Sequence, residues 1–101
     1  MPGLSSKRKG TGFEREVVKQ ARNVGLTARR SWGSDGRSHG LPSEVDVVIN
    51  GLNFQCKRRK NLPAYLLPSH TVSGQIIRGD AGVAHVVLRL SHLFSLISRI
   101  L

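Results

Sequence analysis

The chain has 101 residues, with 16 lysines and arginines, 6 acids and a formal net charge of +10. This length supports one domain with one modest core. The single cysteine excludes an internal disulfide and fits a reducing compartment, and no apolar run is long enough to span a membrane. The basic N-terminus has no apolar segment behind it, so we expect no secretory signal and a cytoplasmic location.

The positive charge is concentrated in the first half of the chain, where residues 1–60 hold 13 of the 16 lysines and arginines. Such a concentration predicts a polyanionic partner, and nucleic acid is the commonest one. A membrane surface is less favoured, because no basic amphipathic helix with bulky apolar residues appears. The alternative is a basic protein whose charge serves only its solubility. The histidines are scattered, and no Cys/His cluster has zinc spacing.

The first half of the chain predicts an arm, a helix, a strand and a loop. Residues 1–10 have the composition of a flexible basic arm, and a helix is expected from about Thr11, a candidate N-cap. Gly25 supplies a left-handed cap at the end of that helix. Residues 26–31 predict a strand, and the Gly-, Ser- and Pro-rich residues 32–43 predict a long mobile loop.

The second half of the chain follows a hairpin and predicts a strand and a last helix. Residues 61–68 contain two prolines and are expected to be irregular, and a short helix is expected near 70–78. Residues 81–90 predict a buried strand. Ser91 would cap a last helix whose apolar side chains enter either the core or a dimer interface. The predicted fold class is α/β, a mixed β-sheet flanked by α-helices, in one domain over 11–101.

The hairpin is centred on Asn50-Gly51, a dipeptide that favours the two-residue type I′ turn. Such a turn fixes the register, so Asp46 should lie opposite Gln55, roughly 5 Å apart at Cβ, with Lys57 on the diagonal. Because side chains alternate between the two faces of a strand, the other face should enter the core. That core face comprises Val45, Val47, Ile49, Leu52, Phe54 and Cys56.

The predicted first helix carries an acid on its apolar face. At roughly 100° per residue, Glu14 falls within the arc of its apolar residues. A carboxylate placed there costs several kcal/mol unless it is paired or bound to a metal. One interpretation is that Glu14 lies at the rim of the core and pairs with an arginine. The other is that it belongs to a functional site. The apolar arc consists of Phe13, Val17, Val18, Ala21 and Val24.

Glu14, Asp46, Gln55 and Lys57 together form a candidate catalytic site. Mg²⁺ prefers hard oxygen ligands, and two carboxylates and the Gln55 amide would supply them, leaving room for water and a phosphate. A lysine near the water would orient it or stabilise developing charge. The cations that follow would hold flanking phosphates, although such a run is also typical of a solvated strand end. These cations are Arg58, Arg59 and Lys60.

Four short motifs occur in one order: KGTGFERE at 9–16, ARRSWGS at 28–34, VDVVI at 45–49 and FQCKRRK at 54–60. In these segments the sequence resembles the archaeal-type Holliday junction resolvases, which also occur in phages and belong to the PD-(D/E)XK nuclease superfamily. The resemblance covers roughly residues 9–65. It implies a restriction-endonuclease-like fold and a homodimer. It also implies Mg²⁺-dependent paired nicks across a four-way DNA junction, with Mn²⁺ as a substitute and no small-molecule cofactor.

The resemblance also implies roles for individual residues. Glu14 and Asp46 match the family's metal-binding acids, Lys57 matches its catalytic lysine, and the backbone carbonyl of Cys56 matches one that completes the metal site. Gln55 stands where the family usually has Glu, which lowers the charge of the ligand set. The Pro that usually precedes the second acid is replaced by Val here. Candidate DNA contacts are Lys7, Arg8, Lys9, Arg15, Arg29, Arg30, Ser31, Trp32, Ser34, Arg37, Arg58, Arg59 and Lys60.

Two aromatic residues have two interpretations each. Trp32 either packs in the core or the dimer, or stacks on an exposed base at the junction branch point. Tyr65 has the same alternatives, and packing is favoured. The whole pattern predicts a structure-selective junction endonuclease. Its rivals are a related nuclease acting on other DNA structures, a binding module weakened by Gln55, and, least favoured, an RNA-binding protein.

Overall fold

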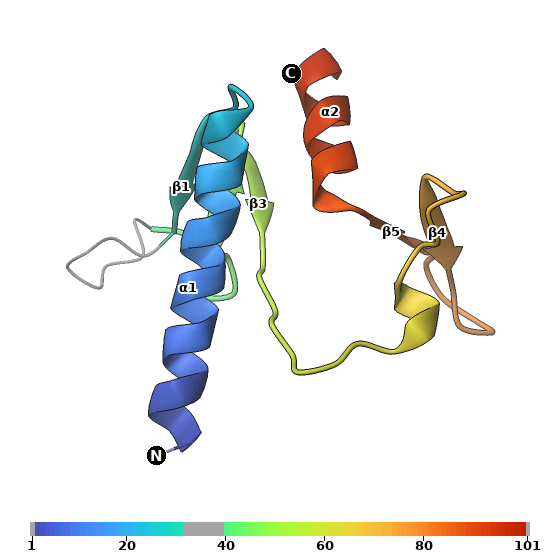
Figure 1. The fold of residues 1–101 in the computed structure, drawn as a ribbon, viewed down its shortest axis with the longest axis horizontal. Helices are drawn as coiled ribbons and strands as arrows, with labels where there is room; N and C mark the ends of the chain where they lie inside the picture. The colour runs from blue at the N-terminus through green and yellow to red at the C-terminus, as the bar shows by residue number, and fades with distance from the viewer. Residues whose placement is uncertain (1, 32–39, 101) are drawn as a thin grey trace. The chain divides into compact units, whose positions relative to one another are not determined.

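A computed structural model describes the backbone of residues 2–31 and 40–100, and side chains from residue 10 onward within those ranges. The chain forms two compact units, residues 1–58 and 59–100. Each unit contains one α-helix and one antiparallel sheet (Figure 1). The predicted α/β class is therefore confirmed, and the architecture is compatible with the restriction-endonuclease-like fold. Whether 11–101 act as one domain stays a prediction.

The first unit consists of one helix and a three-stranded sheet. Helix α1 spans Pro2–Asn23, and the strands are β1 (Ala28–Arg30), β2 (Val47–Ile49) and β3 (Leu52–Phe54). The strand order is β1-β2-β3, with both pairings antiparallel. Helix α1 packs on this sheet through β1 and β2 (Figure 1). Helix α1 and the ends of β1, β2 and β3 therefore belong to the same unit.

Helix α1 begins earlier than predicted and ends as predicted. It starts at Pro2 rather than near Thr11, so the predicted basic arm is helical from its second residue. Proline is accepted in the first helical turn, and the lysines and arginine that follow are good helix formers. At the other end, Leu26 N–H donates to the Ala21 carbonyl at 3.0 Å, and Gly25 has φ +88°. This is a Schellman cap, and it confirms the predicted role of Gly25.

The hairpin has the predicted turn and register. Asn50 and Gly51 have φ values of +47° and +82°, as a type I′ turn requires. The observed pairs are Val47–Phe54, Val48–Asn53 and Ile49–Leu52, and the ladder ends there, so the expected Asp46–Gln55 pair is not part of it. The Asn50 side chain also accepts hydrogen bonds from the backbone N–H and the hydroxyl of Thr27, which ties the turn to the chain entering β1.

The core of the first unit lies between α1 and the sheet. It contains three of the helix positions predicted to face inward and the predicted core face of β2. The other two helix positions are not in the core, because Phe13 is only half-buried and Val24 is 58% exposed. Leu52 is exposed at the turn and Phe54 is only half-buried, so that face becomes less buried along β3. The buried apolar side chains of this unit are Val17, Val18, Ala21, Leu26, Ala28, Val45, Val47 and Ile49.

The second unit contains the 3₁₀ turn η1 (Ala64–Leu66), the strands β4 (Gly74–Ile77) and β5 (His85–Leu88), and helix α2 (Leu90–Ile100). β4 and β5 pair antiparallel. A last strand and a last helix are present as predicted, but the strand covers only His85–Leu88 and is not buried. Helix α2 begins at Leu90, so Ser91 lies inside it and is not its cap. The helix expected near 70–78 is wrong. Its β-branched isoleucines favour a strand, and they pair with a valine-rich partner.

Candidate active site

Asp46 immediately precedes β2 and is held by the strands on both sides. Its backbone N–H donates to the Phe54 carbonyl at 2.9 Å, and its own carbonyl accepts from Ser31 N–H at 2.8 Å. Phe54 is also the registered partner of Val47. Two residues of one strand therefore lie opposite a single residue of the other, which is a β-bulge. Bulges redirect side chains, and this one sets the position of the Asp46 carboxylate.

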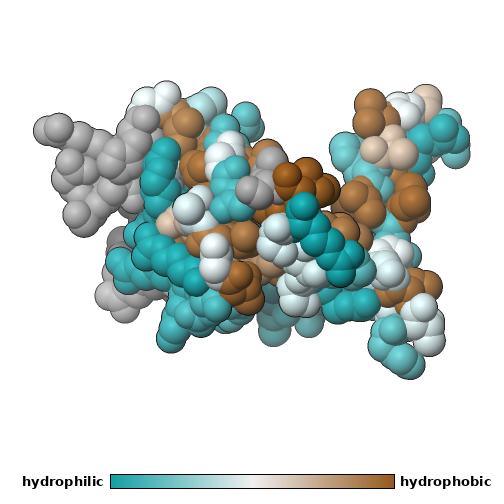
Figure 2. Space-filling view, turned by 90° about the horizontal axis from the view of Figure 1, so that it is seen from above, coloured by the Kyte–Doolittle hydropathy of each residue, from teal (hydrophilic) through white to brown (hydrophobic). Residues whose placement is uncertain are grey.

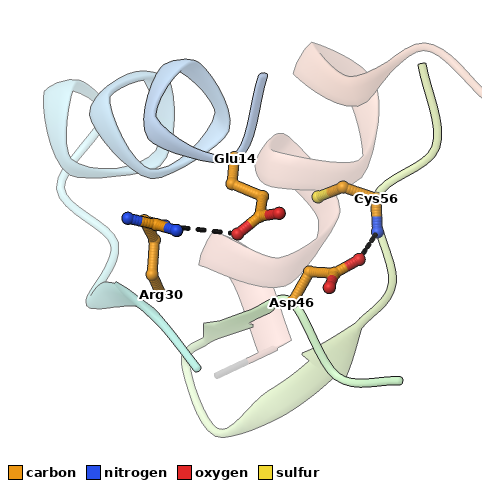
Figure 3. A network of polar contacts seen from close by, with 4 residues as sticks. All are labelled: Glu14, Arg30, Asp46 and Cys56. Carbon is orange, nitrogen blue, oxygen red and sulfur yellow. Dashed lines mark hydrogen bonds and ion pairs between the residues drawn. The ribbon is translucent and has the colours of Figure 1, made fainter. Parts of the chain in front are cut away.

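The Asp46 carboxylate binds the chain where β3 has ended. Its Oδ2 accepts a 2.6 Å hydrogen bond from the backbone N–H of Cys56 (Figure 3). A hydrogen bond to an ionised acceptor is shorter and stronger than a neutral one. The carboxylate thereby satisfies an N–H that the ladder no longer pairs. The predicted acid of the second strand is anchored beside the segment that carries the other candidate residues.

Glu14 projects from α1 toward the same region. Its side chain is 14% exposed, and its Oε1 lies 3.2 Å from Nε of Arg30, the last residue of β1 (Figure 3). The partner helps to offset the cost of placing a carboxylate near the core. Of the two interpretations of Glu14, pairing with an arginine is observed. Arg30 itself was predicted as a DNA contact, and here it pairs with a candidate catalytic acid.

Glu14 and Asp46 meet at the Cys56 thiol. Burial, the Asp46 charge and the Glu14 charge, in that order, raise the pKa of Cys56 from 9.0 to about 11. A thiolate here would be poorly hydrated and would lie beside two negative charges. Figure 3 shows the three side chains, from three separate segments, pointing toward one another. The structure thus brings together the two acids that the sequence analysis assigned to one site.

Cys56 is half-buried with its thiol beside the acids, and the expectation that it faces the core stays a prediction. The prediction extended the alternation of a strand through residue 56, but β3 ends at Phe54. Beyond that point no ladder imposes the pleat. No sequence signal placed the thiol there, since the position depends on where the pairing stops.

Gln55 and Lys57 flank Cys56, and both side chains are exposed. Neither makes a hydrogen bond or an ion pair with another described residue. The hydrogen bond from Cys56 N–H to the Asp46 carboxylate restrains the backbone at residue 56. Gln55 and Lys57 each lie one residue from that restrained position. The predicted cross-strand contact of Gln55 with Asp46 is not formed, because the ladder stops before it.

Ser31 directly follows Arg30 and is fully buried, and its Oγ has no hydrogen-bond partner among the described residues. Leaving a buried hydroxyl unsatisfied costs about 1–3 kcal/mol. The Ser31 hydroxyl does not lie at the surface of the described residues. The DNA contact of Ser31 stays a prediction.

The remaining candidate DNA contacts are distributed between described and undescribed parts of the chain. Trp32, Ser34 and Arg37 lie outside the described residues. Lys7, Arg8 and Lys9 lie in α1, but their side chains are not described. The others are exposed cations, as phosphate contacts require: Arg15, Arg29, Arg58, Arg59 and Lys60.

The donor set suits a hard divalent cation more than a transition metal. Within the described part of the chain, no group of three or more His, Cys, Asp or Glu side chains could hold a metal ion. Mg²⁺ is commonly bound by only one or two carboxylates, with waters and substrate phosphates completing the shell. Two converging carboxylates, Glu14 and Asp46, fit that requirement.

Comparison with known proteins places the chain in a family. The family model for archaeal Holliday junction resolvases (Hjc) matches residues 5–84, which include both acids and the basic segment after β3. By class, the chain is a nuclease. It belongs to the archaeal Holliday junction resolvase family, whose members act on four-way DNA junctions, as the resemblance in the sequence implied. A search of curated proteins found no significant match, and a search of solved structures also found none. No described helix is long and apolar enough to cross a membrane.

Proposed function

We propose that this chain cuts four-way DNA junctions by Mg²⁺-dependent hydrolysis, as a cytoplasmic homodimer that makes paired nicks. The observation that carries the proposal is the meeting of two carboxylates, Glu14 from α1 and Asp46 before β2, beside Cys56. Both acids lie in the stretch that matches the resolvase family. Both acids are half-buried, and two converging carboxylates repel each other unless a cation lies between them.

Glu14 and Asp46 would hold the metal ion, with the Gln55 amide oxygen and the Cys56 carbonyl as further oxygen ligands. The bound ion would supply charge neutralisation and a more acidic water. Lys57 would orient the attacking water or stabilise the charge that develops on the phosphate oxygens. Its distance of one residue from Cys56 supports this role, because the Asp46 hydrogen bond fixes that segment.

Arg30 would exchange partners when substrate binds. In this structure it pairs with Glu14, and it is 25% exposed, so its guanidinium remains accessible to a phosphate. A phosphate group and a carboxylate can each accept two parallel hydrogen bonds from an arginine side chain. We infer that Arg30 neutralises Glu14 in the free protein and contacts the DNA backbone near the cut in the complex. The exposed cations Arg15, Arg29, Arg58, Arg59 and Lys60 would hold flanking phosphates.

The homodimer is proposed because symmetric nicks require two sites related by a two-fold axis. Exposed apolar side chains in the second unit support it, since large exposed apolar patches mark interaction surfaces. Ile100 of α2 is among them, which favours a contribution from that helix.

A cleavage assay with Mg²⁺ tests the proposal, comparing a four-way junction with linear duplex made of the same arms. Preferential cutting of the junction is the expected result. Equal cutting of both would favour a related nuclease that acts on other DNA structures. Tight junction binding with no cutting at any Mg²⁺ or Mn²⁺ concentration would favour the second candidate, a binding module weakened by Gln55. The observation in favour of that candidate is Gln55 itself, where the family usually has a charged acid.

A further inference from the structure

The second unit contains a pocket that the proposed active site does not use. It has a volume of about 510 Å³ and is lined by η1, by β4 with the two residues that follow it, and by the start of β5. Small-ligand sites in proteins commonly measure about 300–1,000 Å³. Its lining combines one aromatic ring, two isoleucines, one guanidinium and one imidazole. These residues are Tyr65, Ile76, Ile77, Arg78 and His85, with Gly79.

Tyr65 is held at the edge of this pocket by a closed turn. Leu66 N–H donates to the Pro63 carbonyl and Leu67 N–H to the Ala64 carbonyl, both at 3.0 Å. The Tyr65 side chain is 67% exposed, so it does not pack in the core of the described chain, and packing in a dimer stays a prediction. The two hydrogen bonds restrain the backbone that carries the ring, which lowers the entropy lost when a ligand binds beside it.

Arg78 is the cation of the pocket. It is exposed and makes no hydrogen bond or ion pair with any described residue, including Asp80, two positions further on. Arg89, by contrast, donates to the carbonyls of Ser69 and Val72 and so holds the loop before β4. Arg78 is therefore available to an anion that enters beside the ring.

The chemistry of the pocket fits a nucleotide better than a protein side chain. Bases stack on tyrosine with little sequence preference, and arginine binds phosphate in bidentate fashion. Ile76 is 82% exposed and adds apolar surface to the pocket lining. Exposed apolar residues are brown in Figure 2. A purely apolar protein partner would leave the Arg78 charge desolvated and unpaired, which is costly. Charge complementarity thus favours DNA.

We propose that this pocket binds one unstacked nucleotide of the DNA substrate, with its base on the Tyr65 ring and its phosphate on the Arg78 guanidinium. The proposal rests on the DNA substrate of the proposed function and names a part of that substrate. A four-way junction supplies such a nucleotide at its branch point, where continuous stacking is interrupted. The pocket would select branched or opened DNA over continuous duplex, whose bases are all stacked.

Fluorescence titrations of the full chain without divalent metal test this proposal. The probes are a short oligothymidylate and a junction with 2-aminopurine at the branch point. Tyr65→Leu is expected to weaken oligothymidylate binding about 5- to 100-fold, as loss of one base–aromatic stack predicts, whereas Tyr65→Phe should stay within about twofold. Tyr65→Leu should also abolish the change in 2-aminopurine emission.

Arg78→Ala and Arg99→Ala form a matched pair, because each removes one exposed arginine from the second unit. Arg78→Ala should weaken oligothymidylate binding at least about threefold more than Arg99→Ala, since only Arg78 lines the pocket. Equal losses would overturn the proposal by reducing Arg78 to a general charge. Unchanged oligothymidylate binding by Tyr65→Leu would overturn the proposal as well. A change in the sedimentation mass of Tyr65→Leu without a change in its oligothymidylate affinity would also overturn it, because the pocket would then belong to a protein contact.

Junction cleavage by the unaltered chain is measured in parallel, so the two proposals fail separately. If the unaltered chain cuts junctions but Tyr65→Leu does not change the affinity for oligothymidylate, the pocket proposal fails and the proposed function stands. If binding depends on Tyr65 and Arg78 but no metal supports cutting, the proposed function fails and the pocket proposal stands.

Discussion

The backbone N–H of Cys56 and the Oδ2 atom of Asp46 lie 2.6 Å apart, and this hydrogen bond organises the candidate site. It forms where the β2–β3 ladder has ended, so a side chain takes over from the backbone as the acceptor. The hydrogen bond therefore links the acid before β2 to the segment after β3. Glu14 then needs only to reach across from α1 for the two acids to meet.

The first prediction concerns the pH dependence of Cys56. Its thiol has a pKa raised to about 11 by burial and by the charges of Asp46 and Glu14, so it stays protonated at neutral pH. Alkylation should be slow at pH 7–9 and should rise toward pH 11. Because the folded pKa exceeds the unfolded one, the folded state holds the proton more tightly between pH 9 and 11. Stability should therefore fall as pH rises through that window.

Rates of alkylation measured against pH, with unfolding midpoints measured in parallel, check this. Asp46→Asn removes one of the two charges and should shift the alkylation profile to lower pH. A profile centred at the ordinary value of 9.0 would show that the thiol does not lie beside the acids.

A second prediction concerns Gln55→Glu. A carboxylate at this position adds negative charge to the proposed ligand set, and the affinity of a hard cation rises with ligand charge. The Mg²⁺ concentration for half-maximal junction cleavage should fall, while junction binding without metal stays nearly the same or weakens slightly. Cleavage rates titrated against Mg²⁺ provide the measurement.

The matched control is Asn53→Asp, which adds the same charge at an exposed position on the same hairpin. If residue 55 is a ligand, only Gln55→Glu should lower the Mg²⁺ requirement substantially. Equal shifts in the two variants would mean that general electrostatics, and not coordination, is responsible.

Gly74 in β4 gives a prediction about stability. A Cβ at this position would lie 2.7 Å from the Val87 carbonyl oxygen and would overlap the Leu88 side chain. Since one of these neighbours is backbone, the strand must shift. Gly74→Ala should lower the free energy of unfolding by about 1–3 kcal/mol, as overpacking commonly does.

Gly79→Ala serves as the comparison, because a Cβ there meets nothing closer than 3.7 Å. Its unfolding midpoint in denaturant should stay close to that of the unaltered chain. If Gly74→Ala is equally harmless, the β4–β5 register is not the one described here.

The parts of the fold that the sequence predicts are those determined by local chemistry. Asn50-Gly51 demands positive φ at two successive positions, and Gly25 suits the left-handed cap, so the turn, its register and the helix end all follow. The strand at 74–77 was missed because a short apolar run does not distinguish strand from helix. Its pairing with β5 decides the matter, and pairing is not a local property.

The sequence predicts the two acids of the candidate site but not the groups that these acids contact. Glu14 stood out as a charge on an apolar face, and Asp46 as an acid in a hairpin strand. Their approach to Cys56 depends on a bulge and on the end of a ladder, which no periodicity encodes. The choice of Arg30 as the partner of Glu14 similarly depends on how α1 packs against β1.

A further prediction concerns assembly. A homodimer is expected by sedimentation at micromolar concentration, and Ile100→Lys should shift it toward monomer by burying a charge in the proposed interface. Paired cutting by a chain that sediments as a monomer would contradict the dimer.

The basic first half of the chain leads to a prediction about salt. Junction affinity should fall steeply as the salt concentration rises, because each neutralised phosphate releases counterions. A flat salt response would contradict the assignment of the basic first half to DNA.

The most direct test of the account is the rate of Mg²⁺-dependent junction cleavage by Asp46→Asn beside that of Asp80→Asn. Both variants exchange a carboxylate for an amide, but only Asp46 meets Glu14 at the site, and an amide at 46 still offers an acceptor to Cys56 N–H. If Glu14 and Asp46 hold the metal ion, Asp46→Asn should bind the junction and not cut it, while Asp80→Asn should cut at the rate of the unaltered chain. Cleavage by Asp46→Asn at that same rate would contradict a metal site built on Glu14 and Asp46.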